Sequence, residues 1–400
     1  MSLSVFYHVL GFQGYHHLKT ERKGSELYLH MVLARNRCAR CHSCQVVSKG
    51  YHLRVLRTVP IGRKSVFALV RMRRFYCQRC HAIRFERLHI ADRKKHYTHV
   101  MERYVMDLCA RMTIRDVSEH TGLHWATVKE IDKKRLKRRL PREIDLKKLR
   151  FLGVDEVSVR RGHNYLTTVV DLETGRVVYV GEGRRVGSLS PFFKRLKRLG
   201  VRPKAIAMDM WKPYAKAVRL YYRGLPLVYD VFHILADYSR ILNEIRVDEA
   251  QKLEGHPEYS LIKGSRFLLL KGEEKLTNSA RDRLDRLLEI NRPLHIAYLL
   301  KEQLRSLWKL PDRTQAENFL NDWIRIALSS GVAPLARFAR KLRRHAVGIL
   351  NYFIFPISTA KVEGINNRIK VIKRQAYGYR DLDYFKLKIY NIHTTRYSLL

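Results

Sequence analysis

Two pairs of cysteines near the start of the chain constrain its fold more than any other feature of the sequence. Cys38 and Cys41 form one CxxC motif, and Cys77 and Cys80 form a second. Two such motifs supply four thiolates in a tetrahedron, which is the geometry of a structural Zn²⁺ site. The long stretch between the motifs must therefore fold back on itself. The alternating pattern of "YHLRVLRTVPIGRKSVFALVRMRRFY" predicts a β-hairpin there.

The neighbours of these motifs leave the exact ligand set open. Cys44 or His42 could replace one of the four thiolates, or Cys44 could be an ordinary free thiol. Clustered cysteines of this kind are typical of metal binding in a reducing cytosol. The N-terminus lacks a basic leader and a cleavage site, and no apolar run approaches the ~18 residues of a membrane span. We therefore expect a cytoplasmic protein that neither crosses nor binds a membrane.

The net charge of the chain indicates a polyanionic partner. The sequence contains 79 Lys and Arg against 37 Asp and Glu, a formal charge of +42. Such self-repulsion is unfavourable unless a polyanion neutralises it. The basic residues are spread through the chain and not confined to one amphipathic helix, which favours nucleic acid over a membrane surface. A hydrophobic content of 46% is typical of a globular protein.

The segment "TIRDVSEHTGLHWATVKEIDKKRLKRR" predicts a helix-turn-helix. Apolar residues on its first helix include Ile114 and Val117, a turn is expected at Gly122, and Val128 and Ile131 follow on the second helix. The second helix continues into a basic run suited to phosphates, which Pro141 is expected to end. An αα-hairpin that packs internally is the alternative. The candidate DNA contacts on this helix are Thr127, Lys129, Lys133, Lys134 and Arg135.

From residue 150 the pattern changes to three strands, a helix, a strand, a helix and a strand, which predicts an α/β domain with a mixed sheet. Asp155 lies in the first strand and Asp209 at the end of the fourth. Burial of a carboxylate in a strand is costly unless it is paired or binds a metal. Neighbouring parallel strands would bring both within reach of two Mg²⁺ ions. Singly, each could equally cap a loop or pair with an arginine.

Near the C-terminus, "TAKVEGINNRIKVIKRQAYGYR" predicts an amphipathic helix. Val362, Ile365 and Ile369 recur at helical spacing and form an apolar stripe. The opposite, polar face of the helix is expected to contain Glu363, Asn366, Asn367, Lys370 and Arg374. The helix alone leaves two interpretations open: a solvated face with charge pairs, or a metal-binding carboxylate beside a phosphate backbone.

In this order, the segments resemble the ISL-three family of DDE-type bacterial insertion-sequence transposases. The resemblance is carried by "FLGVDEVSVRRGHNYLTTVVDLETGRVV", "AIAMDMWKPYAKAV", "VYDVFHILADYSRILNEIR" and "STAKVEGINNRIKVIKRQAYGYRDLDYF". It implies a ribonuclease-H-like α/β catalytic core with a large all-helical insertion, preceded by a small zinc-binding β domain and a helix-turn-helix. The implied domains are 1–92 (zinc-binding), 93–147 (helix-turn-helix), 148–234 with 358–400 (catalytic) and 235–357 (helical insertion).

The resemblance also implies roles for single residues. Asp155, Asp209 and Glu363 would be the catalytic carboxylates and the ligands of two Mg²⁺ ions, with Mn²⁺ as an alternative. Asp230 and His233 resemble an accessory Asp-x-x-His element, which could position DNA or support the metal site. The alternative for this pair is a hydrogen bond at a strand-to-helix joint. Phosphate contacts are expected from Asn366, Lys370, Lys373 and Arg374.

The expected function is that of a DNA transposase in the bacterial cytoplasm, associated with the nucleoid. It would bind the terminal inverted repeats, cleave DNA with Mg²⁺ and transfer the strand to target DNA, as a homodimer or larger synaptic complex. Two alternatives remain: a non-catalytic DNA-binding regulator derived from a transposase, and a ribonuclease-H-like nuclease without strand transfer. Trp308 and Trp323 could stack a flipped base, although core packing is the expected role.

Overall fold

The computed structural model describes residues 4–34, 38, 40–42, 45–160 and 164–393. The chain forms two compact units. Unit 1 contains Met1–Arg142 and Gln375–Leu387, and unit 2 contains Glu143–Arg374 and Lys388–His393. Within the described ranges, no helix combines the length and the apolar character that crossing a membrane requires.

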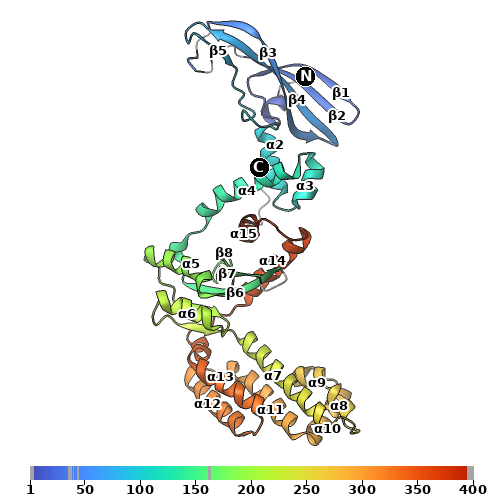
Figure 1. The fold of residues 1–400 in the computed structure, drawn as a ribbon, viewed down its shortest axis with the longest axis vertical. Helices are drawn as coiled ribbons and strands as arrows, with labels where there is room; N and C mark the ends of the chain where they lie inside the picture. The colour runs from blue at the N-terminus through green and yellow to red at the C-terminus, as the bar shows by residue number, and fades with distance from the viewer. Residues whose placement is uncertain (1–3, 35–37, 39, 43–44, 161–163, 394–400) are drawn as a thin grey trace. The chain divides into compact units, whose positions relative to one another are not determined.

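Unit 1 begins with a short helix, α1 (Ser4–His8), and a twisted sheet (Figure 1). Its described strands follow the order β1-β2-β4-β3, with β5 on β4. Strands β3 and β4 are antiparallel and joined at Gly62, which confirms the predicted hairpin. Buried side chains that include Leu29, Leu56 and Val70 form the core beneath the sheet. The strands are β1 (Tyr15–Lys23), β2 (Glu26–Leu33), β3 (Val46–Ile61), β4 (Lys64–Cys77) and β5 (Ala82–Phe85).

Three helices of unit 1 form the predicted helix-turn-helix region. Thr113 caps α3 in a capping box with Asp116, and Gly122 ends that helix in the left-handed conformation that glycine adopts without strain. The sequence predicted that this helix ends at Pro141, but α4 extends to Glu143, because a proline in the last turn removes only one backbone N–H from the helical hydrogen bonds. The helices are α2 (His99–Leu108), α3 (Ile114–Thr121) and α4 (Trp125–Glu143).

Unit 2 contains a mixed sheet in the order β10-β9-β6-β7-β8. Strand β6 is parallel to β9 and antiparallel to β7, and β10 is parallel to β9. Numbered within this sheet, the order is 5-4-1-2-3, which is the ribonuclease-H-like arrangement expected from the resemblance. The strands are β6 (Phe151–Arg160), β7 (Asn164–Asp171), β8 (Val177–Glu182), β9 (Ala205–Met208) and β10 (Leu227–Tyr229).

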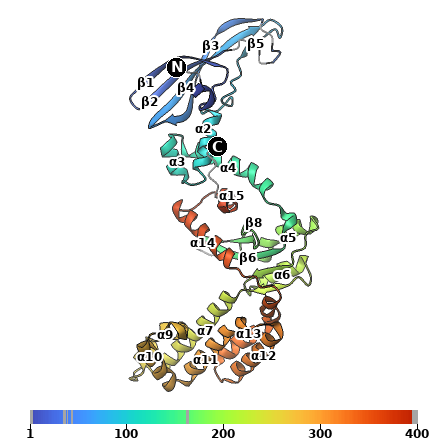
Figure 2. The same cartoon turned by 180° about the vertical axis from the view of Figure 1, so that it is seen from behind.

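Helices cover both faces of this sheet (Figure 2). On one face, α5 (Val186–Arg198) and α6 (Lys212–Tyr221) bury Phe192 and Tyr214 in the core that contains Val154 and Met208. Side chains alternate along a strand, so Gly153 and Asp155 of β6 face the opposite side. There α14 (Ala360–Gln375) packs so closely that a Cβ atom at Gly153 would lie 2.5 Å from Val362. The close approach of α14 therefore requires a glycine beside Asp155.

The segment between β10 and α14 is helical, as predicted (Figure 1). Trp323 is 2% exposed, donates its indole N–H to the carbonyl of Leu300, and packs edge-on against Tyr238. Trp308 also packs against this core, which confirms core packing for both tryptophans. The helices are α7 (Val231–Lys252), α8 (Tyr259–Lys263), α9 (Arg266–Leu270), α10 (Asn278–Ile290), α11 (Arg292–Ser306), α12 (Arg313–Ser329) and α13 (Ala333–Leu350). Helix α15 (Leu382–Tyr390) follows α14.

Candidate metal centres and DNA-binding face

The four cysteines of the two CxxC motifs meet in unit 1. Their sulfur atoms lie within 4.8 Å of one another. Sγ of Cys38 is 3.8 Å from Sγ of Cys80, and Sγ of Cys41 is 3.5 Å from Sγ of Cys77. A Zn²⁺ ion with ~2.3 Å bonds to four sulfurs in a tetrahedron needs sulfur–sulfur distances of ~3.8 Å. These two distances are close to that value, so the four thiolates fit the donor set and spacing of a structural zinc site.

The hairpin explains why the motifs meet. The second motif begins at Cys77, the last residue of β4, which pairs with Val46 at the start of β3. The imidazole of His42 is not among the ligand atoms that converge, and its backbone has a φ of +58°, a turn conformation after the first motif. Cys44 lies outside the described residues.

The second cluster lies in unit 2, at the ends of adjacent parallel strands. Carboxylate oxygens of Asp155 and Asp209 and a ring nitrogen of His233 lie within 4.8 Å of one another. These three residues form the acidic cluster. Asp155 projects from β6, and Asp209 directly follows β9. Parallel pairing of β6 with β9 brings the two carboxylates together, as the sequence predicted from the strand order.

The environment of this carboxylate pair favours a bound cation. Burial, followed by the negative charge of Asp209, raises the pKa of Asp155 to about 7. Oδ1 of Asp209 is buried, and within the described residues it has no hydrogen-bond partner. Burial and the charge of Asp209 also raise the pKa of Glu156, which faces the α5–α6 side. Carboxylate oxygens are the preferred ligands of Mg²⁺, so the donor set fits such an ion.

His233 and Asp230 have separate partners. Nδ1 of His233 lies 2.7 Å from Oδ2 of Asp209, and this hydrogen bond raises the pKa of the imidazole to about 9 despite its partial burial. Asp230 is 2% exposed and caps the N-terminus of α7. Its Oδ2 accepts hydrogen bonds from the backbone N–H (2.8 Å) and the hydroxyl of Thr359, which precedes α14. His233 thus belongs to the acidic cluster, whereas Asp230 ties the start of α7 to the start of α14.

Helix α14 presents Asn366, not Glu363, to Asp155. The amide Nδ2 of Asn366 donates a 2.7 Å hydrogen bond to Oδ2 of Asp155, and Asn366 is 4% exposed. The sequence had assigned Asn366 to a phosphate. At ~100° per residue it lies only about 40° from Val362, at the edge of the apolar stripe, and this position accounts for its burial. Glu363 is exposed in the first turn of α14, and its carboxylate lies outside the acidic cluster.

The other basic candidates on α14 remain at the surface. Lys370 is exposed and donates to Oδ1 of Asn367. Lys373 donates to the carbonyl of Ser158 at 3.3 Å, and Arg374 is exposed. Lys370 and Arg374 therefore share the exposed side of α14 with Glu363, whereas Lys373 lies closer to the apolar stripe and reaches β6.

The five candidates on α4 differ in their surroundings. Lys134 is exposed and Thr127 is partly buried. Arg135 donates to the carbonyl of Met106, so it serves the packing of α2 against α4. Lys129 and Lys133 are each 2.8 Å from Oδ2 of Asp381, an interaction that the sequence did not suggest.

The segment that carries Asp381 is fastened to α4 within unit 1. Oδ1 of Asp381 accepts a 3.0 Å hydrogen bond from the backbone N–H of Tyr384, and the hydroxyl of Tyr384 donates to Asp132 at 2.6 Å. Residues 375–387 cluster with the helix-turn-helix in unit 1. The sequence around a single charged residue such as Asp381 does not indicate which residues it will contact in the fold.

Comparison with known proteins identifies the class. Residues 152–389 match a family model described as a transposase, and residues 86–136 match the helix-turn-helix domain of transposase family ISL3. The chain is 37% identical over 355 residues to the transposase for insertion sequence element IS1001 of Bordetella parapertussis, covering 87% of each. It is 26% identical over 369 residues to the transposase for IS1557 of Mycobacterium tuberculosis, covering 86% of this chain and 82% of that protein.

The chain belongs to transposase family ISL3. Among solved structures, a chain of the Drosophila P element transposase strand transfer complex aligns with a TM-score of 0.39 and 12% identity, covering 74% of this chain and 92% of that chain. The family confirms the resemblance seen in the sequence, and the helix-turn-helix indicates DNA as the partner.

Proposed function

We propose that this chain is a DNA transposase that binds the terminal inverted repeats of its element and cleaves and joins DNA by a DDE mechanism. In this proposal Asp155, Asp209 and Glu363 hold two Mg²⁺ ions. The observation that carries it is the convergence of Asp155 and Asp209, two carboxylates in partly buried positions that repel each other without a cation. Bound ions would activate the attacking oxygen and stabilise the leaving oxygen of a phosphodiester.

The side chains around the carboxylates would position them. Asn366 holds Oδ2 of Asp155 through its amide, which fixes the direction of that carboxylate. The imidazolium of His233 holds Oδ2 of Asp209 and leaves the buried Oδ1 available to a cation. Hydrogen-bonded partners of this kind orient metal ligands and tune their affinity. We therefore assign Asn366 and His233 to positioning.

Glu363 is proposed as the third carboxylate on two grounds. It lies one turn before Asn366 on α14, and α14 packs against β6 beside Asp155. Its side chain is exposed, so a change of rotamer costs little before a cation binds. A cation would gain a further oxygen ligand, and the three carboxylates would then act as one unit.

The DNA-binding elements would act before the chemistry. The zinc-stabilised sheet and the helix-turn-helix would recognise the inverted repeat, with Lys134 at a phosphate. The exposed cations Lys370 and Arg374 of α14 would hold the scissile strand. Two DNA ends must be held together for transposition, so we propose a homodimer or larger synaptic complex.

The test is cleavage of DNA that carries the inverted repeats flanking the gene. Asp155→Ala, Asp209→Ala and Glu363→Ala should each abolish Mg²⁺-dependent cleavage and keep end binding, as judged by gel shift. Glu173→Ala, a matched loss of an exposed carboxylate in the β7–β8 turn, should keep full activity. Wild-type activity in any one of the three site variants would refute the proposed triad.

The same reaction separates the two alternatives. Products joined to a target plasmid distinguish a transposase from a nuclease without strand transfer. End binding without cleavage by the wild-type protein would instead identify a non-catalytic regulator.

A further inference from the structure

A basic groove lies between α7 and α13 in the helical insertion of unit 2. It has a volume of about 260 Å³, and its walls contain four cationic side chains and one carboxylate. Phe338, which is 2% exposed and packs edge-on against Tyr238, is part of its lining. The residues that line it are Asp237, Arg240, Ile241, Arg337, Phe338, Lys341 and Arg344.

The acidic residues at the groove neutralise only part of this charge. Asp237 pairs with both Arg240, at 2.9 Å, and Lys341. Arg337 pairs with Glu244 at 2.6 Å, on a side chain that is 56% exposed. Arg344 forms no ion pair among the residues that the structure describes. The groove therefore keeps a net positive charge.

The cations of α13 are arranged at a cost to the helix. Arg337 and Lys341 are four residues apart, and Lys341 and Arg344 are three apart, so like charges lie side by side on one face. Burial and then the charges of Lys341 and Arg344 lower the pKa of His345, and Lys212 and Arg219 of α6 contribute to the same effect. The positive field thus extends from the groove to the surface of α6. A bound polyanion would offset this repulsion.

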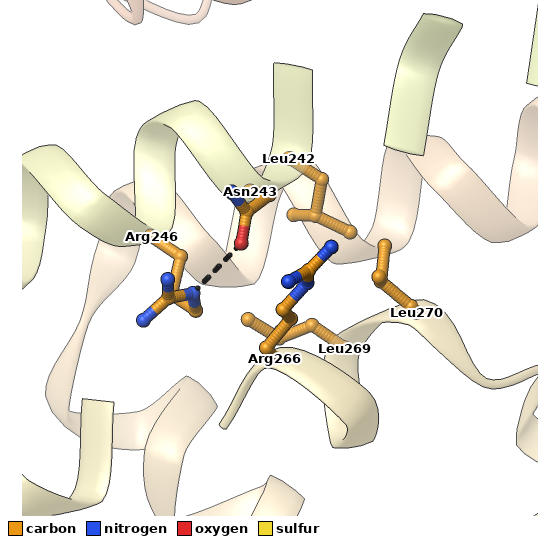
Figure 3. Close-up of a pocket in the computed structure, with 6 residues that line it drawn as sticks. All are labelled: Leu242, Asn243, Arg246, Arg266, Leu269 and Leu270. Atoms are coloured by element: carbon orange, nitrogen blue, oxygen red, sulfur yellow. Dashed lines mark hydrogen bonds between the residues drawn. The ribbon is translucent and has the colours of Figure 1, made fainter. Parts of the chain in front are cut away.

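The size and lining of the groove indicate a backbone phosphate and not a small organic ligand. Sites for such ligands are mostly apolar and enclose roughly 300–1,000 Å³. Three of the four cations are arginines, whose planar guanidinium groups bind phosphate oxygens in pairs. By contrast, the depression between α7 and α9 in Figure 3, where Arg246 donates to Asn243, has essentially no enclosed volume.

Helix α7 connects this groove to the acidic cluster. His233, which contacts Asp209, lies in the first turn of α7, and Asp237 of the groove follows one turn later. We propose that the groove between α7 and α13 binds the phosphate backbone of duplex DNA that extends from the cleavage site. This inference rests on the proposed function, since it requires DNA at the acidic cluster.

The test compares two variants with the same loss of charge. The groove variant is Arg240→Gln/Arg337→Gln/Arg344→Gln. The control is Arg281→Gln/Arg283→Gln/Arg325→Gln, which replaces three exposed arginines on α10 and α12 of the same insertion. Binding of a fluorescein-labelled duplex of random sequence is measured by anisotropy between about 50 and 200 mM KCl, where phosphate contacts dominate the salt dependence.

In the groove variant, the slope of log K against log salt should become less steep by about 0.9 for each lost phosphate contact, about 2.7 in all. In the control variant, the slope should change clearly less. Asp237→Asn should have the opposite effect, because it releases Arg240 and Lys341 from their acidic partner. This gain of affinity cannot come from misfolding. Equal slopes for the groove and control variants, or weaker binding by Asp237→Asn, would overturn the proposal.

All binding is measured without divalent ions, so cleavage plays no part in the readout. Failure of the groove proposal would leave the carboxylate assignment intact, and an active Asp155→Ala variant would refute that assignment without changing these slopes. A groove variant that alters only self-association in sedimentation experiments without DNA would identify an interface between copies and refute DNA binding at this groove.

Discussion

Asp230 joins the two helices that carry His233 and Asn366, so we expect its removal to destabilise unit 2. Its carboxylate caps α7 by accepting from the backbone N–H of Phe232 at 2.7 Å, and it accepts two hydrogen bonds from Thr359. Loss of an N-cap costs about 1 kcal/mol, and each buried hydrogen bond to a charged group contributes about 1.5–3 kcal/mol. Asp230→Ala should therefore lower the free energy of unfolding by about 4 kcal/mol or more.

Thr359→Val separates the two parts of this interaction. It removes only the hydroxyl bond and should cost about 1.5–3 kcal/mol. Because both changes delete the same contact, the double variant should be no less stable than Asp230→Ala alone. Asp248→Ala, at an exposed position on α7, serves as the control and should change stability by less than about 0.5 kcal/mol.

Urea unfolding followed by tryptophan fluorescence measures these differences, since Trp211, Trp308 and Trp323 all lie in unit 2. Hydrogen exchange of α14 reports whether its first turn opens when the link to α7 is lost. A loss below about 1 kcal/mol for Asp230→Ala, or full additivity of the two substitutions, would refute the linking role of Asp230.

Three further predictions concern metals, pH and DNA affinity. Zinc should be found at one ion per chain, and Cys77→Ser should abolish it and melt the β3–β4 hairpin, as seen by elemental analysis and hydrogen exchange. Asp155 must lose its proton to bind a cation, and its pKa is raised to about 7. Calorimetry should therefore find that Mg²⁺ affinity rises about tenfold per pH unit below pH 7 and levels off above it; a flat profile would contradict this. Asp381→Asn keeps the cap of α15 but releases Lys129 and Lys133 from their acidic partner. The slope of log K against log salt for DNA binding should therefore steepen by the equivalent of up to about two phosphate contacts. An unchanged slope would mean that these lysines do not contact DNA.

The sequence by itself determined the features that depend on local pattern. Alternation of apolar residues identified the β3–β4 hairpin, and the CxxC spacing identified the four cysteines that it joins. The run of strands and helices after residue 150 predicted the mixed sheet. The places of Asp155 and Asp209 on its strands predicted that their carboxylates lie close together. These features are predictable because side-chain periodicity and metal-ligand spacing are properties of neighbouring residues.

Only the tertiary structure decided which polar groups meet across long separations. Asn366 contacts Asp155, Thr359 contacts Asp230, and Asp381 contacts Lys129. A helical pattern states that a residue is polar and where it lies around the axis, but not what packs against it. Asn366 at the edge of the apolar stripe is buried, while Glu363 in the preceding turn stays exposed, because β6 approaches α14 closely at Gly153. The partner of a polar side chain is thus set by the packing of elements, which is a non-local property of the chain.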